Sequence, residues 1–201
     1  MESKNFDMLL AGVGGQGIIF AGQIILESAL SEGYRVYAFE EHGMARRGGA
    51  VASHIRFGEE LYTPLIPVGT GKLLAAFEPA EALRHMHFMD SGSKIILNTK
   101  PVVPVSVSTG KGSYPEVNDI IDIIINYSRE IYALNATSLA EQAGNPISMN
   151  AVMIGAISAC GAVPLPKEIV LEIVQKRSPS YSKDINTRAF ELGYDMVEDA
   201  K

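Results

Sequence analysis

Short apolar runs alternate along this chain with longer segments in which apolar residues recur every three or four positions. The first run, residues 6–11, is typical of a buried strand, and residues 17–30 have the spacing of a helix that ends before Gly33. Further strands are predicted at 35–39, 51–57, 72–77, 94–98 and 130–135. Further helices are predicted after Pro79 and near 116–127, 137–143, 147–160, 166–177 and 183–198.

Strands that alternate with helices favour an α/β fold. We expect a single Rossmann-like domain over residues 1–201, with a mostly parallel sheet, helices on both faces and a helical C-terminal part. The stretch 99–115, which is rich in proline and glycine, is predicted to form a long excursion at the edge of the sheet. In the last helix, four apolar residues at helical spacing are expected to face the core: Ile185, Ala189, Leu192 and Met196.

Composition narrows the class of protein. The 47% hydrophobic content is enough for a substantial core, and the net charge of −6 argues against nucleic-acid or anionic-membrane binding, which need a basic face. One cysteine, Cys160, excludes a disulfide framework and an iron–sulfur cluster held by cysteines of this chain alone. The longest apolar tract, 151–163, is shorter than the roughly 20 residues of a membrane helix, and the first residues lack an apolar signal core. We therefore expect a cytoplasmic protein.

Four glycines within six residues follow the first strand, and Gly12, Gly14 and Gly17 match the pattern G-x-G-x-x-G. Such a turn lets a ligand approach the main chain, and it directs the free N–H groups of the next helix at an anion. The loop could bind NAD, because Glu40 lies 23 residues after Gly17, where an acidic residue would hold a ribose hydroxyl. The glycines could also serve only close packing of strand and helix.

A second loop, Arg46, Arg47, Gly48 and Gly49, directly follows the acidic residues Glu40 and Glu41. Arginine suits phosphate and carboxylate, because its planar group can donate two parallel hydrogen bonds. We expect this loop to face the same sheet edge as the first. His42 is a further candidate, because its charge can respond near neutral pH, although it could equally stabilise the loop by a hydrogen bond.

No metal site is predicted. His85 and His87 form H-x-H in a predicted helix, where residues two positions apart face different ways. His54 and Cys160 are interpreted as buried structural residues. No catalytic residue is assigned to the chain.

The motifs "GVGGQGI" and "EEHGMARRGG" followed by "SHIRFG" resemble the gamma-type subunits of the 2-oxoacid:ferredoxin oxidoreductases. The stretches "YTPLIPVG", "LLAAFEPAEALR" and "NTKPVVPV" are similar to the small, beta subunits of the indolepyruvate branch of that family. The resemblance covers roughly residues 6–195.

The resemblance implies CoA-dependent oxidative decarboxylation of an aryl 2-oxo acid to an acyl-CoA, carbon dioxide and reduced ferredoxin. It implies that thiamine diphosphate and the iron–sulfur clusters belong to a large alpha subunit, and this chain has no G-D-G segment of the diphosphate-binding kind. Glu41, Gly48 and Gly49 would shape the second loop. The residues implied as a shared coenzyme A cradle are Gly12, Gly14, Gly15, Gln16, Gly17, Arg46 and Arg47.

Two other interpretations remain open at this point. The chain could be a stand-alone NAD-dependent dehydrogenase that uses Glu40 or Glu41, although no general base with supporting partners is evident in the sequence. It could also be a purely structural interaction subunit whose glycine loop binds nothing.

Overall fold

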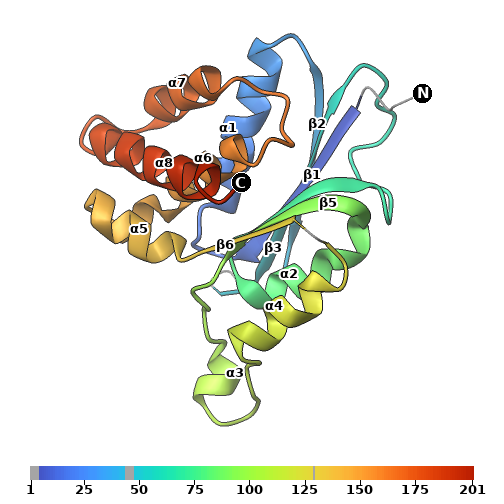
Figure 1. The fold of residues 1–201 in the computed structure, drawn as a ribbon, viewed down its shortest axis with the longest axis vertical. Coiled ribbons are helices and arrows are strands. Elements are labelled where there is room, and N and C mark those ends of the chain that lie inside the picture. Colours follow the sequence, from blue (N-terminus) through green and yellow to red (C-terminus); the bar gives the residue numbers. More distant parts are fainter. Residues whose placement is uncertain (1–4, 44–47, 129) are drawn as a thin grey trace.

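A computed structural model describes residues 5–43, 48–128 and 130–201. At its centre lies a six-stranded sheet in the order β2-β3-β1-β4-β5-β6 (Figure 1). The strands are β1 (Asn5–Val13), β2 (Arg35–His42), β3 (Ala50–Gly58), β4 (Gly71–Ala76), β5 (Met89–Asn98) and β6 (Glu130–Leu134). The pairs β1–β4, β4–β5 and β5–β6 are parallel, whereas β3 runs antiparallel to both β1 and β2. The prediction of a mostly parallel sheet is therefore confirmed.

Helices cover both faces of the sheet, as predicted. On one face lie α1, α5, α6, α7 and α8, and on the other lie α2 and α4 (Figure 1). Their bounds are α1 (Ile18–Ser31), α2 (Pro79–His85), α4 (Val117–Ile125), α5 (Ala136–Ala143), α6 (Met149–Ala159), α7 (Lys167–Arg177) and α8 (Lys183–Glu198). Two short 3-10 turns, η1 (Met86–Phe88) and η2 (Pro146–Ser148), precede β5 and α6. No helix among the described residues is both long and apolar enough to cross a bilayer.

The central strand β1 has no polar side chain from Met8 onward because both of its faces are covered, as is typical of parallel sheets. Its one buried charge, Asp7, makes a bidentate ion pair with Arg56 on β3, at 2.7 and 3.0 Å. Nη1 of Arg56 also donates to the main-chain oxygens of Thr63 and Leu65. One guanidinium group therefore holds the segment between β3 and β4 against the sheet.

Helices α6 and α8 pack with their main chains in close contact, which the apolar pattern of the sequence does not predict. A Cβ atom on Gly155 would collide with the main chain at Phe190, and one on Gly193 would collide with the main chain at Val152. This contact turns α8 so that Gly193 faces the core, and Met196 is left 46% exposed. The expectation that Met196 faces the core is wrong for this reason.

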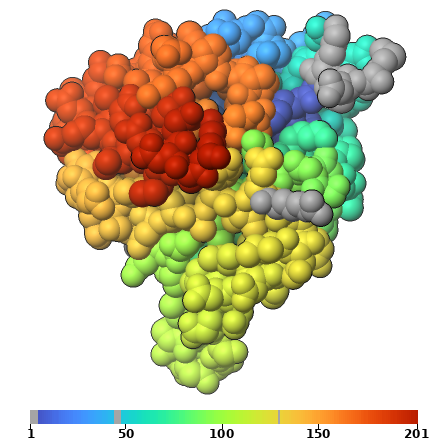
Figure 2. All heavy atoms as spheres, viewed as in Figure 1, coloured from blue at the N-terminus to red at the C-terminus, as the bar shows by residue number. Residues whose placement is uncertain are grey.

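The excursion at 99–115 leaves the carboxyl end of β5 and contains the short helix α3 (Val105–Ser108). In Figures 1 and 2 this segment projects from the body of the protein. Val103 and Val105 within it are exposed.

Candidate functional site

The glycine loop connects β1 to α1 at the carboxyl edge of the parallel strands, where α/β sheets bind ligands. Gly15 has a φ angle of 105°, and Gly17, the N-cap of α1, has a φ angle of 77°. Residues other than glycine rarely adopt φ angles in this range. Among the described residues no side chain caps the first turn of α1, so its main-chain N–H groups face the loop.

Gln16 fixes the shape of this loop through both ends of its side-chain amide. Its Oε1 accepts from the N–H of Val13 at 2.8 Å, and its Nε2 donates to the main-chain oxygen of Phe77 at 2.7 Å. Asn98 Nδ2 donates to the same oxygen at 2.9 Å. The ends of β1, β4 and β5 are thereby joined at one point.

The glycines of the loop differ in what surrounds them. A Cβ atom on Gly12 would lie 2.6 Å from Gln16 Oε1 and 2.9 Å from Phe77 Cβ, and one on Gly17 would overlap Asn150. These two positions are therefore needed for close packing. Around Gly15 there is no heavy atom within 4 Å of such a Cβ among the described residues, so this glycine faces open space.

That open space is a hollow of about 290 Å³ above the start of α1. It is lined by Val13, Gly14, Gly15, Gly17, Ile18, Ile19 and Val51. Main-chain groups and apolar side chains make up this lining. It suits a ligand that offers an anion to the helix N-terminus and an apolar portion to the surrounding side chains.

The second glycine loop meets the first, as predicted. Gly14 donates its N–H to the oxygen of Gly49 at 2.8 Å, and Gly48 donates to the oxygen of Gly14 at 3.4 Å. Arg46 and Arg47, the predicted anion contacts, lie outside the described residues. The position of Gly48 places the end of their loop at the same edge of the sheet.

The acidic residues are not arranged as a ribose site requires. In the dinucleotide-binding fold the strand that carries the acid lies beside β1. Here β3 lies between β1 and β2, so Glu40 and Glu41 are one strand further away. Glu41 Oε1 lies 3.5 Å from His54 Nε2, and Glu40 lies 3.3 Å from His42. This geometry disfavours the NAD interpretation.

His54 is fully buried on β3, and its Nδ1 accepts from the N–H of Ile66 at 3.3 Å. Burial lowers the pKa of His54, and the nearby Glu41 carboxylate opposes this effect only in part. His85 is buried as well, and burial lowers its pKa. Both histidines therefore support the fold, as the sequence analysis predicts for His54.

A polar cluster that was not predicted from the sequence lies beside the glycine loop. Glu78 is buried, and its carboxylate accepts from the hydroxyl of Tyr114 at 2.5 Å and from the N–H of Glu81 at 3.2 Å. Burial, together with the Glu78 carboxylate, raises the pKa of Tyr114 well above its usual range. The cluster lines a cleft of about 420 Å³ that also touches Val13 and Gly48. Glu78 and Tyr114 lie 36 positions apart, so no local motif marks them.

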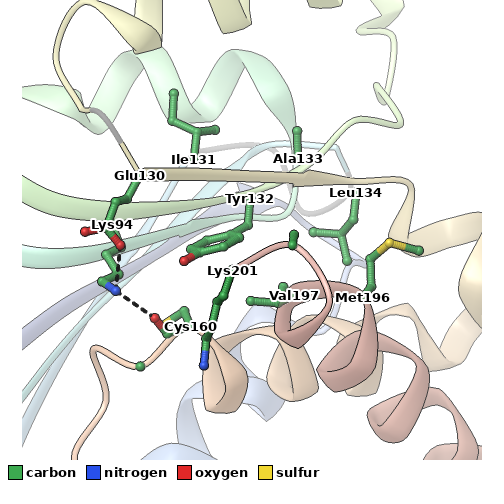
Figure 3. A pocket seen from close by; sticks show the side chains of 12 residues that line it. Lys94, Glu130, Ile131, Tyr132, Ala133, Leu134, Cys160, Met196, Val197 and Lys201 are labelled. Carbon is green, nitrogen blue, oxygen red and sulfur yellow. Dashed lines mark hydrogen bonds and ion pairs between the residues drawn. The ribbon is translucent and has the colours of Figure 1, made fainter.

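A larger hollow, of about 810 Å³, lies away from this loop, between β6 and α8 (Figure 3). Lys94 bridges two groups there: its Nζ lies 2.6 Å from Glu130 Oε2 and donates to the main-chain oxygen of Cys160 at 2.9 Å. Cys160 is buried, as predicted, and burial raises the pKa of its thiol.

Comparisons with known proteins identify relatives of this chain in sequence and in fold. The sequence matches the family described as pyruvate ferredoxin/flavodoxin oxidoreductase over residues 7–196. It is 38% identical over 191 residues to an indolepyruvate oxidoreductase subunit, IorB, of Thermococcus kodakarensis, which covers 94% of this chain and 95% of that protein.

Two solved structures share the fold. The gamma subunit of a keto/oxoacid ferredoxin oxidoreductase from Geobacter sulfurreducens has a TM-score of 0.71 at 22% identity, covering 96% of this chain and 98% of that chain. A 2-oxoglutarate:ferredoxin oxidoreductase from Magnetococcus marinus, solved with 2-oxoglutarate, coenzyme A and succinyl-CoA bound, has a TM-score of 0.76 at 21% identity. The match covers 98% of this chain but only 32% of that longer chain.

A single α/β domain with a glycine-rich turn at its carboxyl edge defines a class of ligand-binding proteins. Within that class, this chain belongs to the pyruvate ferredoxin/flavodoxin oxidoreductase family.

Proposed function

We propose that this chain is the small subunit of an indolepyruvate:ferredoxin oxidoreductase. The supporting observation is its 38% identity, over nearly the full length of both chains, to a protein named as an indolepyruvate oxidoreductase subunit. The large partner subunit would hold thiamine diphosphate and the iron–sulfur clusters. The whole complex would convert an aryl 2-oxo acid and coenzyme A into an aryl-acetyl-CoA, carbon dioxide and reduced ferredoxin.

Within that complex, the glycine loop would form part of the coenzyme A site. Gly14, Gly15 and the first N–H groups of α1 would face a phosphate or the pantetheine chain. Gly12, Gln16 and Gly17 would keep the loop in shape. Arg46 and Arg47 would add charge-assisted contacts to the anion.

Anaerobic copurification with the tagged chain from its own cells tests the assignment to a complex. The expected result is a large subunit that carries iron, acid-labile sulfide and thiamine diphosphate, and that reduces ferredoxin with indolepyruvate and coenzyme A. A chain recovered alone from cells that express the large subunit would contradict the proposal.

A glycine pair tests the coenzyme A role in the assembled enzyme. Gly15→Val would place a side chain in the open cradle, so we expect the KM for coenzyme A to rise about tenfold while the iron content stays unchanged. Gly69→Val is the matched control, because Gly69 also has a positive φ angle and open surroundings but lies in the segment before β4. Equal coenzyme A kinetics in the two variants would remove the glycine loop from the site.

A further inference from the structure

The cleft beside the glycine loop is bounded by the excursion at 99–115, by α2 and by the end of the second glycine loop. Apolar side chains form much of its wall: Val13, Ala50, Val102, Pro104, Val107 and Pro115. Its volume of about 420 Å³ is sufficient for a small organic molecule. A largely apolar wall with a few polar groups is typical of a pocket for such a ligand.

Glu81 on α2 lines this cleft with a carboxylate that is only partly satisfied. The residue is 5% exposed, and its Oε1 lies 3.1 Å from Nε of Arg84. Its Oε2 is buried and has no hydrogen-bond partner in the part of the chain that the structure describes. Buried polar atoms in proteins are nearly always hydrogen-bonded. The Oε2 atom is therefore complementary to a ligand that donates an N–H or O–H group.

The other polar groups of the cleft already have partners. Oε1 of Glu78 accepts from the hydroxyl of Tyr114 and from the N–H of Val102, and its Oε2 accepts from the N–H of Glu81. The hydroxyl of Tyr114 also accepts from the N–H of Ala80 at 3.2 Å. Glu81 Oε2 thus differs from its neighbours in having an acceptor position to offer.

The charge of the cleft disfavours an anionic ligand. Two carboxylates, Glu78 and Glu81, and one guanidinium, Arg84, are the charged groups among its described lining residues. The phosphates of coenzyme A would be repelled here. They would remain in the neighbouring hollow of the glycine loop, whose described lining has no charged side chain. Val13 lines both spaces, so the two lie next to each other at the end of β1.

The excursion forms a wall that can move to admit a ligand. None of its residues is buried, and the Glu78 carboxylate holds it near both of its ends, at Val102 and Tyr114. A displacement of the segment between these two residues would leave the core intact.

We propose that this cleft binds the aromatic ring of the 2-oxo acid and that Glu81 Oε2 accepts a hydrogen bond from the ring N–H. This inference rests on the proposed function. The indole ring combines an apolar surface with one N–H donor, as the cleft requires. The 2-oxo acid end would leave the cleft beside the glycine loops, because the two carboxylates repel it. Glu81 is therefore a residue of the small subunit that determines substrate specificity.

Steady-state kinetics of the assembled enzyme test this proposal with two substrates of the same shape. Indole-3-pyruvate carries the ring N–H, and benzofuran-3-pyruvate has an oxygen in its place. We expect the native enzyme to have a kcat/KM at least about tenfold higher for the indole compound, because the benzofuran leaves Glu81 Oε2 without a donor. This first measurement requires no variant.

Variants of Glu81 then assign the preference to its carboxylate. Glu81→Leu removes the acceptor, so we expect kcat/KM for the two substrates to agree within about twofold, mainly through a loss for the indole compound. Glu81→Gln keeps an acceptor oxygen and should retain a preference of at least about fivefold. A residue that only stabilised α2 would change both substrates by the same factor.

Two control variants leave the acceptor in place. Glu116→Leu removes an exposed carboxylate that is not among the residues lining the cleft, and it should keep the native preference. Tyr114→Phe loosens the excursion from Glu78 and should change kcat/KM for both substrates equally. A preference that survives Glu81→Leu, or that disappears in Tyr114→Phe, would overturn the assignment to Glu81.

Failure of this inference can be told apart from failure of the proposed function. If the native complex does not oxidise indole-3-pyruvate, the proposed function fails. If it does so but shows no preference over the benzofuran compound, only the role of the cleft is excluded. A Glu81→Leu chain that no longer binds the large subunit, as judged by iron and thiamine content, would assign Glu81 to assembly and would also exclude that role.

Discussion

The side-chain amide of Gln16 spans the glycine loop and reaches the main-chain oxygen of Phe77, at 2.7 Å, just beyond the end of β4. The same amide accepts the N–H of Val13 at the end of β1. A glycine-rich loop is costly to order, because glycine loses more conformational freedom on folding than other residues. Gln16 offsets part of that cost and leaves the main chain of Gly14 and Gly15 open.

Gln16→Ala should therefore destabilise the chain by about 1 to 2 kcal/mol and raise the KM for coenzyme A in the assembled enzyme, because two hydrogen bonds to the loop are lost. Gln16→Glu should have a larger effect, since a carboxylate cannot donate to the Phe77 oxygen and would repel an anion. Urea unfolding and steady-state kinetics check the two effects separately. If Gln16→Ala has the same free energy of unfolding as the native chain, the two hydrogen bonds of Gln16 do not order the loop.

Gly17 and Asn150 provide a test of the packing role. Gly17→Ala places a Cβ at a positive φ angle and against Asn150, so we expect a loss of more than about 2 kcal/mol. In an Asn150→Ala background the overlap with the side-chain amide disappears and a close contact of 3.1 Å with the Cβ of residue 150 remains, so we expect the cost to fall toward the roughly 1 kcal/mol of the backbone angle. Thermal unfolding of the four chains in this cycle measures the difference. Equal costs in both backgrounds would mean that Asn150 moves aside freely.

The helices and strands of this fold could be predicted because the spacing of apolar residues that identifies each one lies within its own segment. Each predicted strand and helix corresponds to an observed one, and α1 ends before Gly33 as expected. The order of the strands could not be read in this way. Placing β3 between β1 and β2 depends on antiparallel pairing of β1 with β3, whose paired residues run from Val13 with Ala50 to Asn5 with Gly58 and are far apart in the sequence. This placement separates Glu40 from the glycine loop.

The site was predictable only where its residues are contiguous. The contact between the two glycine loops was expected because both loops were placed at the same edge of the sheet. It is confirmed by the hydrogen bonds that Gly14 makes with Gly49 and Gly48. The partner of Gln16 lies 61 positions away, and no pattern in the sequence marks Phe77 as the acceptor. Met196 was assigned to the wrong face because the close contact at Gly193 is a tertiary effect.

The buried pair of Asp7 and Arg56 should matter more for stability than ion pairs at the surface. Arg56→Met leaves the Asp7 carboxylate unpaired in a buried position and releases the oxygens of Thr63 and Leu65, so we expect a loss of about 3 to 5 kcal/mol. Glu27→Gln, which weakens the more exposed pairs with Lys176 and Arg177, should cost about 1 kcal/mol or less. Urea unfolding at neutral pH compares the two variants. Similar losses in both would contradict a special role for the buried pair.

His54 should make the stability of the chain depend on pH below neutrality. Burial holds the folded-state pKa of His54 below its ordinary value of 6.5, so the unfolded chain takes up the proton more readily. The stabilisation is therefore complete above pH 6.5 and is lost as the pH falls from 6.5 toward the folded-state pKa, by at most about 1.4 kcal/mol per pH unit. Burial raises the pKa of Glu81 above 4.5, which has the opposite effect at lower pH.

The measurement is urea unfolding between pH 7.5 and 5.5 for the native chain and for His54→Gln, with His87→Gln as the control at an exposed position. We expect the free energy of unfolding to fall less steeply in His54→Gln than in the native chain, and His87→Gln to follow the native curve. His85, whose pKa burial also lowers, should leave a residual slope in both variants. Parallel curves for the native chain and His54→Gln would show that the folded and unfolded chains take up a proton on His54 equally, and would remove His54 as the source of the pH dependence.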